Sequence, residues 1–218
     1  MSLGLRKIIS LRKGQIGRVI IHILPTMSSH QLQKWRTQSS QILFDHPRLT
    51  VAEDTVELPN GKIVQYVHYP YHGHGGVIVV CRRGDNILVQ REYSYPVDEV
   101  LYQFPGGKIE AGEDVCAAAQ RELAEESGIA MTGVRACGWL YADNRRTSAK
   151  LHVVYGKYAG TNHQHRPDDT EQIISEWLPI ATIHRMVATG AITNYAMLAA
   201  WALLASTLQQ AGDSRADE

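Results

Sequence analysis

The sequence lacks an excess of charge of either sign. Its 218 residues include 22 lysines and arginines and 22 aspartates and glutamates, which gives a formal net charge of zero at pH 7. Proteins that bind nucleic acid through their overall field carry a positive excess or a basic stripe. We therefore expect no nucleic-acid partner, and the neutral charge disfavours an RNA-directed decapping role.

Cysteine is scarce as well. The three cysteines, Cys81, Cys116 and Cys137, are far apart, lie in apolar surroundings and form no C-x-x-C pair. A small, odd and dispersed set of this kind excludes a disulfide framework and is typical of a reducing compartment. We expect buried, inert thiols and a cytoplasmic protein.

Long hydrophobic runs and clusters of metal-binding histidines are also missing. The apolar runs at residues 19–24 and 196–204 are much shorter than the roughly 20 residues that span a bilayer. We expect no membrane partner, and a core or dimer helix around the second run. The histidine pairs at 72 and 74 and at 163 and 165 have no third ligand at useful spacing, which disfavours a zinc site.

The first 26 residues differ in composition from the rest of the chain. They contain five basic residues and no acidic residue. This composition agrees with an organellar targeting peptide, and it agrees equally with a natural start at Met27. In either case we expect residues 1–26 to be a peripheral or poorly ordered extension.

The remaining chain predicts a mixture of strands and helices. We expect a short helix over residues 30–39, then a β-hairpin whose turn is Pro59-Asn60-Gly61. These form an N-terminal segment, residues 27–72, ahead of a main domain, residues 73–211, and a disordered tail, residues 212–218. The expected hairpin strands are 49–58 and 63–69, the later strands are 77–81, 87–93, 100–104, 134–141, 151–158 and 173–178, and the later helices are 114–127, 180–189 and 193–210.

One stretch, residues 106–129, carries residues of fixed type at fixed spacing. It reads GGKIEAGEDVCAAAQRELAEESGI. Asp114 to Ser127 has strong helix formers and no proline or glycine, acidic residues stand at its start, and Gly128 follows its end. These features predict a helix with ordinary caps at both ends.

The expected helix brings three carboxylates together. Glu122, Glu125 and Glu126 stand at positions i, i+3 and i+4, so they share one face and repel each other. Such a face is usually only solvated, but the flanking glycines and the register of Glu113 and Arg121 favour a functional site. Hard oxygen ligands suit Mg²⁺, with Mn²⁺ as an alternative.

The same stretch resembles the Nudix box, G-x5-E-x7-R-E-U-x-E-E-x-G-U with U aliphatic, and it fills every specified position. The resemblance covers roughly residues 40–210. It implies an α+β fold of the Nudix type, an α/β/α sandwich with a mixed sheet, here preceded by the N-terminal hairpin. It also implies hydrolysis of a nucleoside diphosphate linked to another group.

The flanking segments resemble the ADP-ribose/ADP-sugar pyrophosphatase branch of this family. They are residues 89–97, 103–113, 58–61 and 190–194. The branch implies release of AMP and a sugar phosphate by a homodimer in which the partner chain contributes to the adenosine pocket. The chain departs from the branch at Ser94, where arginine is usual, at Gln103, where glutamate is usual, and at Arg145, where proline is frequent.

The resemblance also implies roles for individual residues. Glu122, Glu126 and the backbone carbonyl of Gly106 would be metal ligands. Glu125 would be a further ligand or would act through water, and Glu113 would pair with Arg121 to hold the loop onto the helix. The general base would come from Asp168, Asp169 or Glu171, of which we favour Glu171. Arg91 and Arg145 are candidates for phosphate contacts and Tyr93 for stacking on the base, although a solvated loop and a core tyrosine are the simpler interpretations.

Two other classes of function remain open. One is hydrolysis of a different nucleotide, such as GDP-mannose, a UDP-sugar or a modified triphosphate. The long N-terminal segment disfavours the triphosphate, because small triphosphate-directed members lack it. The other is a sensor that binds a nucleotide-sugar without turnover, which the intact box disfavours.

Overall fold

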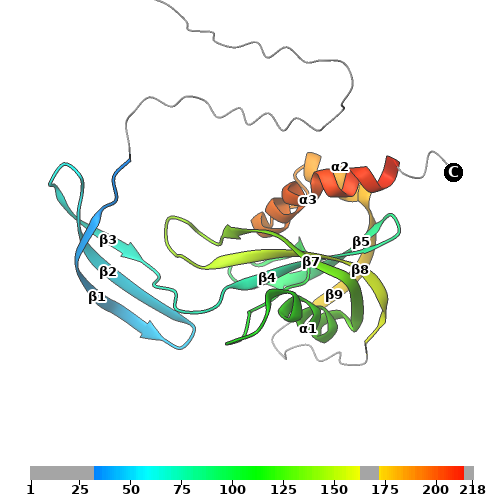
Figure 1. Cartoon of the computed structure of the whole chain (residues 1–218), viewed down its shortest axis with the longest axis horizontal. Coiled ribbons are helices and arrows are strands. Elements are labelled where there is room, and N and C mark those ends of the chain that lie inside the picture. Colours follow the sequence, from blue (N-terminus) through cyan, green and yellow to red (C-terminus); the bar gives the residue numbers. More distant parts are fainter. Residues whose placement is uncertain (1–31, 163–171, 214–218) are drawn as a thin grey trace, which may run out of the picture.

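The computed structural model describes residues 32–162 and 172–213, with side chains up to Leu204 (Figure 1). The N-terminal extension predicted over residues 1–26 lies outside this range. At the other end, the last helix continues through Asp213 and so enters the segment that we expected to form the tail.

The N-terminal segment is a three-stranded antiparallel sheet in the order β1-β2-β3 (Figure 1). Its strands are β1 (Arg36–His46), β2 (Leu49–Glu57) and β3 (Ile63–His68). The predicted hairpin is confirmed as β2 and β3. Its turn is closed by a hydrogen bond of 2.8 Å from Leu58 N to the carbonyl of Lys62.

The prediction of a helix over residues 30–39 is wrong for the part that the structure describes. Residues 36–39 belong to β1, whose register begins with Arg36 opposite Glu57. Side-chain contacts join the two strands, from Arg36 to Glu57 and, at 2.8 Å, from Gln41 Nε2 to Glu53 Oε1. Pairing with β2 therefore overrides the local helix preference.

The main sheet is mixed, as predicted. Its order is β6-β5-β4-β8-β7, with β9 paired to the other edge of β5. β4 and β8 are parallel and the other pairs are antiparallel. The bounds are β4 (Gly76–Arg83), β5 (Asn86–Ser94), β6 (Glu99–Gln103), β7 (Ile129–Tyr141), β8 (Lys150–Thr161) and β9 (Ile173–Pro179).

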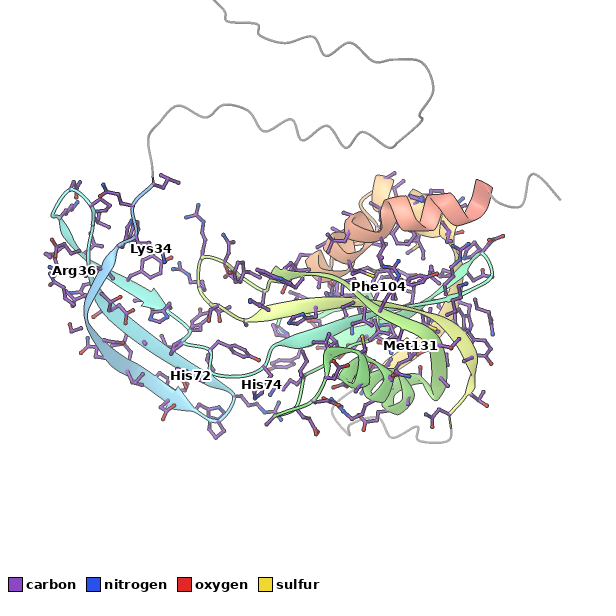
Figure 2. The ribbon with its side chains drawn as sticks, viewed as in Figure 1. Lys34, Arg36, His72, His74, Phe104 and Met131 are labelled. Atoms are coloured by element: carbon purple, nitrogen blue, oxygen red, sulfur yellow. The ribbon has the colours of Figure 1, made fainter. Side chains whose placement is uncertain are left out.

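Helices cover both faces of this sheet (Figure 1). α1 (Val115–Ser127) lies on one face, and α2 (Ile180–Ala188) and α3 (Tyr195–Asp213) lie on the other. Phe104 belongs to the apolar cluster beneath α2 and α3, and Met131 belongs to the cluster beneath α1 (Figure 2). The predicted sandwich is confirmed. None of the described helices is long and apolar enough to cross a membrane.

β4 and β5 separate soon after the turn that joins them. They pair only at Arg82 with Ile87 and at Arg83 with Asn86. Residues 105–107 bond to β4 instead, through Val79 N to the Pro105 carbonyl at 2.7 Å and Val77 N to the Gly107 carbonyl at 2.8 Å. Residues 105–107, which we call the glycine loop, are therefore hydrogen-bonded along β4.

Candidate active site

The helix that carries the carboxylates is defined at both ends by local chemistry. Asp114 caps its start, because the side chain accepts hydrogen bonds from the backbone N–H groups of Cys116 and Ala117 at 2.8 and 3.1 Å. Gly128 ends it in the left-handed conformation, with φ of 65°. Ala118, Ala119 and Leu123 are fully buried against the sheet. This packing fixes the rotation of α1 and so the direction of its glutamates.

Arg121 lies at the centre of an ionic cluster. Its guanidinium donates to Glu113 at 2.8 and 3.0 Å, to Glu122 at 3.0 Å, to Glu125 at 3.0 Å and to the Lys108 carbonyl at 2.9 Å. The Glu113–Arg121 ion pair expected from the sequence is present. Arg121 ties the loop of residues 108–113 to the helix and offsets part of the repulsion within the glutamate face.

Glu126 is held in a different way from its neighbours. Its side chain is only 7% exposed, and Oε2 accepts hydrogen bonds from Gln90 Nε2 at 3.0 Å and from Gly106 N at 3.2 Å. The sequence had given no role to Gln90. The hydrogen-bond donors from Gln90 and Gly106 to Glu126 are electrically neutral, whereas Glu122 and Glu125 accept from the positively charged guanidinium of Arg121.

Glu122 and Glu126 both lie against the paired glycines. A Cβ placed on Gly107 would lie 2.5 Å from the carboxylate atoms of Glu122, and Gly106 N bonds to Glu126. The carbonyls of Pro105 and Gly107 are used by β4, while no described residue donates to the carbonyl of Gly106. Both carboxylates therefore lie close to Gly106 and Gly107.

The oxygen atoms near the two glycines are of a type that suits Mg²⁺, although they are few. No group of three or more histidine, cysteine, aspartate or glutamate side chains in the described ranges is arranged to hold a metal ion. Mg²⁺ is commonly held by one or two carboxylates, with waters and substrate phosphates completing its octahedron. Glu122, Glu126 and the Gly106 carbonyl would hold it, and all three are hard oxygen ligands.

The other predicted residues are spread over several elements. Arg91, on β5, pairs with Glu176 at 3.1 Å. Tyr93, also on β5, donates its hydroxyl to Asp98 at 2.9 Å, and this hydrogen bond raises the pKa of the tyrosine. Arg145 lies in the loop that joins β7 to β8. The structure does not bring these three side chains together. The candidate bases Asp168, Asp169 and Glu171 lie outside the described residues.

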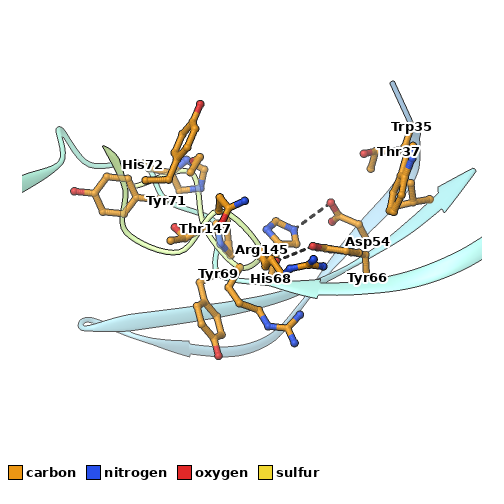
Figure 3. Close-up of a pocket in the computed structure, with 16 residues that line it drawn as sticks. Trp35, Thr37, Asp54, Tyr66, His68, Tyr69, Tyr71, His72, Arg145 and Thr147 are labelled. Carbon is orange, nitrogen blue, oxygen red and sulfur yellow. Dashed lines mark hydrogen bonds and ion pairs between the residues drawn. The ribbon is translucent and has the colours of Figure 1, made fainter. Parts of the chain in front are cut away.

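Arg145 lines a groove of about 880 Å³ between the N-terminal sheet and the loop of residues 142–149 (Figure 3). The sheet and the loop are joined by hydrogen bonds from Tyr66 Oη to the Arg145 carbonyl and from Tyr69 N to the Arg146 carbonyl, both 2.7 Å. Five of the lining residues are tryptophan or tyrosine, and we call the hollow the aromatic groove after them: Trp35, Tyr66, Tyr69, Tyr71 and Tyr141. In the sequence, only the close spacing of the tyrosines at 66, 69 and 71 indicates this groove.

A smaller cavity of about 380 Å³ reaches the glycine loop. Gln103, Gly106, Lys108 and Asn194 are among the residues that line it. Tyr71 lines both the aromatic groove and this cavity, so the aromatic groove lies next to the glycine loop.

The Glu113–Arg121 pair predicts how stability responds to acid. The hydrogen bond from Arg121 holds the pKa of Glu113 below its ordinary value of 4.5, so its stabilisation is present above that value and is lost as the pH falls through the lowered pKa. We expect Glu113→Gln to cost roughly 1 kcal/mol of unfolding free energy at pH 7. The difference from wild type should shrink steadily below pH 4.5 in urea unfolding curves. A difference that is the same at pH 7 and pH 3 would contradict the assignment.

Comparison with known proteins identifies the family. The sequence model of the Nudix domain matches residues 72–201. The chain belongs to the Nudix family. This confirms the prediction of a Nudix hydrolase. Ahead of the Nudix domain, a model described as the nucleoside diphosphate sugar hydrolase N-terminal domain matches residues 35–66.

Two curated relatives share limited identity with this chain over part of its length. An ADP-ribose pyrophosphatase of Bacillus subtilis (strain 168) is 24% identical over 139 residues, which cover 64% of this chain and 75% of the relative. A methanol dehydrogenase activator of Bacillus methanolicus is 33% identical over 96 residues, which cover 43% of this chain and 50% of the relative. The match to this second relative thus spans about half of its length.

A solved structure supports the fold assignment. It is described as the crystal structure of an ADP compounds hydrolase, and its TM-score against this chain is 0.77 at 23% identity. The match covers 84% of this chain and 99% of the other. At this identity the likeness establishes the Nudix fold with its N-terminal sheet.

Proposed function

We propose that the protein is a metal-dependent hydrolase of the pyrophosphate bond in a nucleoside diphosphate linked to a sugar, with ADP-ribose or an ADP-sugar as the substrate. The products would be AMP and a sugar phosphate. The observation that carries the proposal is the approach of Glu122 and Glu126 to the glycine loop, with Glu122 hydrogen-bonded to Arg121.

Each part of the site has a task in this reaction. Mg²⁺, or Mn²⁺ in its place, would supply positive charge for the pyrophosphate oxygens and would make water a better nucleophile. Glu122, Glu126 and the Gly106 carbonyl would hold it, and Glu125, one turn from Arg121, would act directly or through water. The Glu113–Arg121 ion pair holds the loop of residues 108–113 against α1.

Substrate contacts and the general base complete the proposal. Arg91 and Arg145 would bind phosphate oxygens, because a guanidinium can donate to two of them at once. Tyr93, which is 41% exposed, lies outside the aromatic groove, so the base would stack either on Tyr93 or on the aromatic side chains of that groove. Glu171 would remove the proton from the attacking water.

The choice of an ADP-sugar is supported by the N-terminal sheet and its groove. Residues 35–66 match a domain named for nucleoside diphosphate sugar hydrolases, and the Bacillus subtilis relative is an ADP-ribose pyrophosphatase. An aromatic groove of about 880 Å³ has the size and the faces that a nucleobase requires. Ser94, Gln103 and Arg145 are the positions where this chain departs from that branch.

The proposal includes a cytoplasmic homodimer. The edge strand β1 is exposed along its whole length and carries Ile42, Leu43 and Phe44, each more than half exposed. Exposed apolar edge strands favour pairing with another chain. Light scattering coupled to gel filtration would test this part, and a monomer at micromolar concentration would refute it.

A hydrolysis screen tests the activity. Purified protein is incubated with Mg²⁺ and, separately, with ADP-ribose, ADP-glucose, UDP-glucose, GDP-mannose, NADH, a dinucleoside polyphosphate and nucleoside triphosphates, and the products are separated by chromatography. We expect AMP and ribose 5-phosphate from ADP-ribose and no turnover of triphosphates. Preference for another sugar nucleotide would refute an ADP-sugar as the substrate but would agree with the proposed reaction. Tight binding without turnover would refute the proposal that the protein is an enzyme.

A further inference from the structure

Gln90 is an unusual residue for its position. It lies in the middle of β5, opposite Gln103 of β6 and Ser175 of β9, and it is fully buried. Side chains alternate along a strand, so Gln90 shares the face of Leu88, whose other buried neighbours beneath α1 are apolar. A polar group in such surroundings is unfavourable unless it is hydrogen-bonded.

Its amide is only partly satisfied. Nε2 donates to Glu126 Oε2 at 3.0 Å, whereas Oε1 is buried and has no hydrogen-bond partner among the described residues. Exchanging the two amide atoms would turn an oxygen toward the carboxylate and would be repulsive, so the carboxylate itself fixes the orientation. An apolar side chain of the same length would pack there without leaving an unpaired oxygen. Packing alone therefore does not account for a glutamine.

The side-chain amide of Gln90 is an uncharged hydrogen-bond donor to Glu126, and this lack of charge matters for a metal site. A buried carboxylate needs hydrogen-bond donors to stay ionised, and an arginine or lysine would supply them together with a charge that competes with a bound cation. Gln90 and the backbone N–H of Gly106 supply two donors without any charge. They converge on one oxygen from the strand and from the loop, so they fix the rotation of the carboxylate.

We infer that Gln90 is a positioning residue of the metal site, which orients the ionised carboxylate of Glu126 toward a divalent cation. The inference rests on the proposed function, because it takes Glu126 to be a metal ligand. Gln90 is fully buried and donates to Glu126, so it acts through that carboxylate. Residues that orient metal ligands in this way typically change metal affinity by about 10–100-fold when they are replaced.

The test measures metal binding without substrate. Gln90→Met removes the amide at nearly constant length, and Gln120→Met is the matched control, since Gln120 is an exposed glutamine on α1 itself. Mn²⁺ is titrated into each full-length protein and free Mn²⁺ is followed by electron paramagnetic resonance. We expect the dissociation constant to rise by about 10–100-fold in Gln90→Met and to stay unchanged in Gln120→Met. Unchanged Mn²⁺ binding by Gln90→Met would overturn the inference.

Two further measurements separate the possible failures. Glu126→Gln is titrated alongside, and if it binds Mn²⁺ as wild type does, the metal site of the proposed function is wrong. If Glu126→Gln loses Mn²⁺ but Gln90→Met does not, only the inference about Gln90 fails. In Gln90→Met, raising Mg²⁺ should restore kcat for the substrate found in the screen, which a damaged fold would not allow.

Folding of the variants is checked by thermal unfolding in EDTA. If Gln90→Met does not fold, Gln90→Asn is measured in its place, because the shorter side chain keeps the amide but moves it away from Glu126. Weakened Mn²⁺ binding by folded Gln90→Asn supports the inference. Failure of both variants to fold would overturn it, since Gln90 would then serve the core.

Discussion

Glu126→Gln will lower the rate of hydrolysis by at least about a thousandfold while leaving the fold intact. Glutamine keeps an oxygen that can accept the hydrogen bonds from Gln90 and Gly106, but it removes the negative charge from a side chain that is 7% exposed. Loss of one charged ligand removes several kcal/mol of stabilisation from the transition state, and about 1.4 kcal/mol corresponds to a factor of ten. Initial rates at saturating Mg²⁺ give the measurement.

The control is the same substitution at an exposed carboxylate. Glu110→Gln lies in the loop before α1, and we expect its rate to stay within about twofold of wild type, as is usual for an exposed residue outside the site. The melting temperature of Glu126→Gln should equal that of wild type or exceed it, because a buried charge has been removed. A residual rate above a tenth of wild type would exclude Glu126 from the metal ligands.

Gly106→Ala will destabilise the protein strongly. A Cβ at this position would lie 2.1 Å from the Val77 carbonyl oxygen and 3.2 Å from Ile78 Cα, both atoms of the β4 backbone. No side chain can turn aside to make room, so the loop must leave β4 and give up its hydrogen bonds with Val77 and Val79. We expect a loss of about 3 kcal/mol or more and a fall in melting temperature of about 6–12 °C, measured by circular dichroism.

Gly107→Ala supplies the contrast, because its Cβ would meet the carboxylate of Glu122 at 2.5 Å and not the backbone. A flexible side chain can move, so the melting temperature should fall much less than in Gly106→Ala. Activity should still fall, because Glu122 is displaced from the glycine loop. Equal melting temperatures for Gly106→Ala and wild type would show that the loop does not lie against β4.

Features fixed by neighbouring residues were predictable from the sequence. The caps of α1 depend on Asp114 and Gly128, and the pairing of Glu113 with Arg121 follows from two turns of one helix and its adjoining loop. The strands of the main sheet carry dense β-branched and apolar residues, which mark them without knowledge of their partners. For these elements the local chemistry and the final structure agree.

Features fixed by distant residues were not predictable. The β1 segment, RTQSSQILFDH, is exposed throughout and shows no alternation, so it becomes a strand only because β2 offers it a free edge. Gln90 is separated from Glu126 by 36 residues, and nothing near it in the sequence shows that the end of α1 lies above β5. The aromatic groove likewise needs the contact between β3 and the loop after β7.

The separation between β4 and β5 has a consequence for how this protein can change over evolutionary time. The proposed metal ligands lie on the glycine loop and α1, whereas the aromatic groove is built mainly by the N-terminal sheet and the β7–β8 loop. Among the described residues that line the groove, Tyr71 alone also lines the cavity at the glycine loop, so substitutions at the others leave the hydrogen bonds between that loop and β4 in place. Under the proposed function, selection can therefore change which nucleotide is accepted through residues of the groove while the proposed metal ligands are retained.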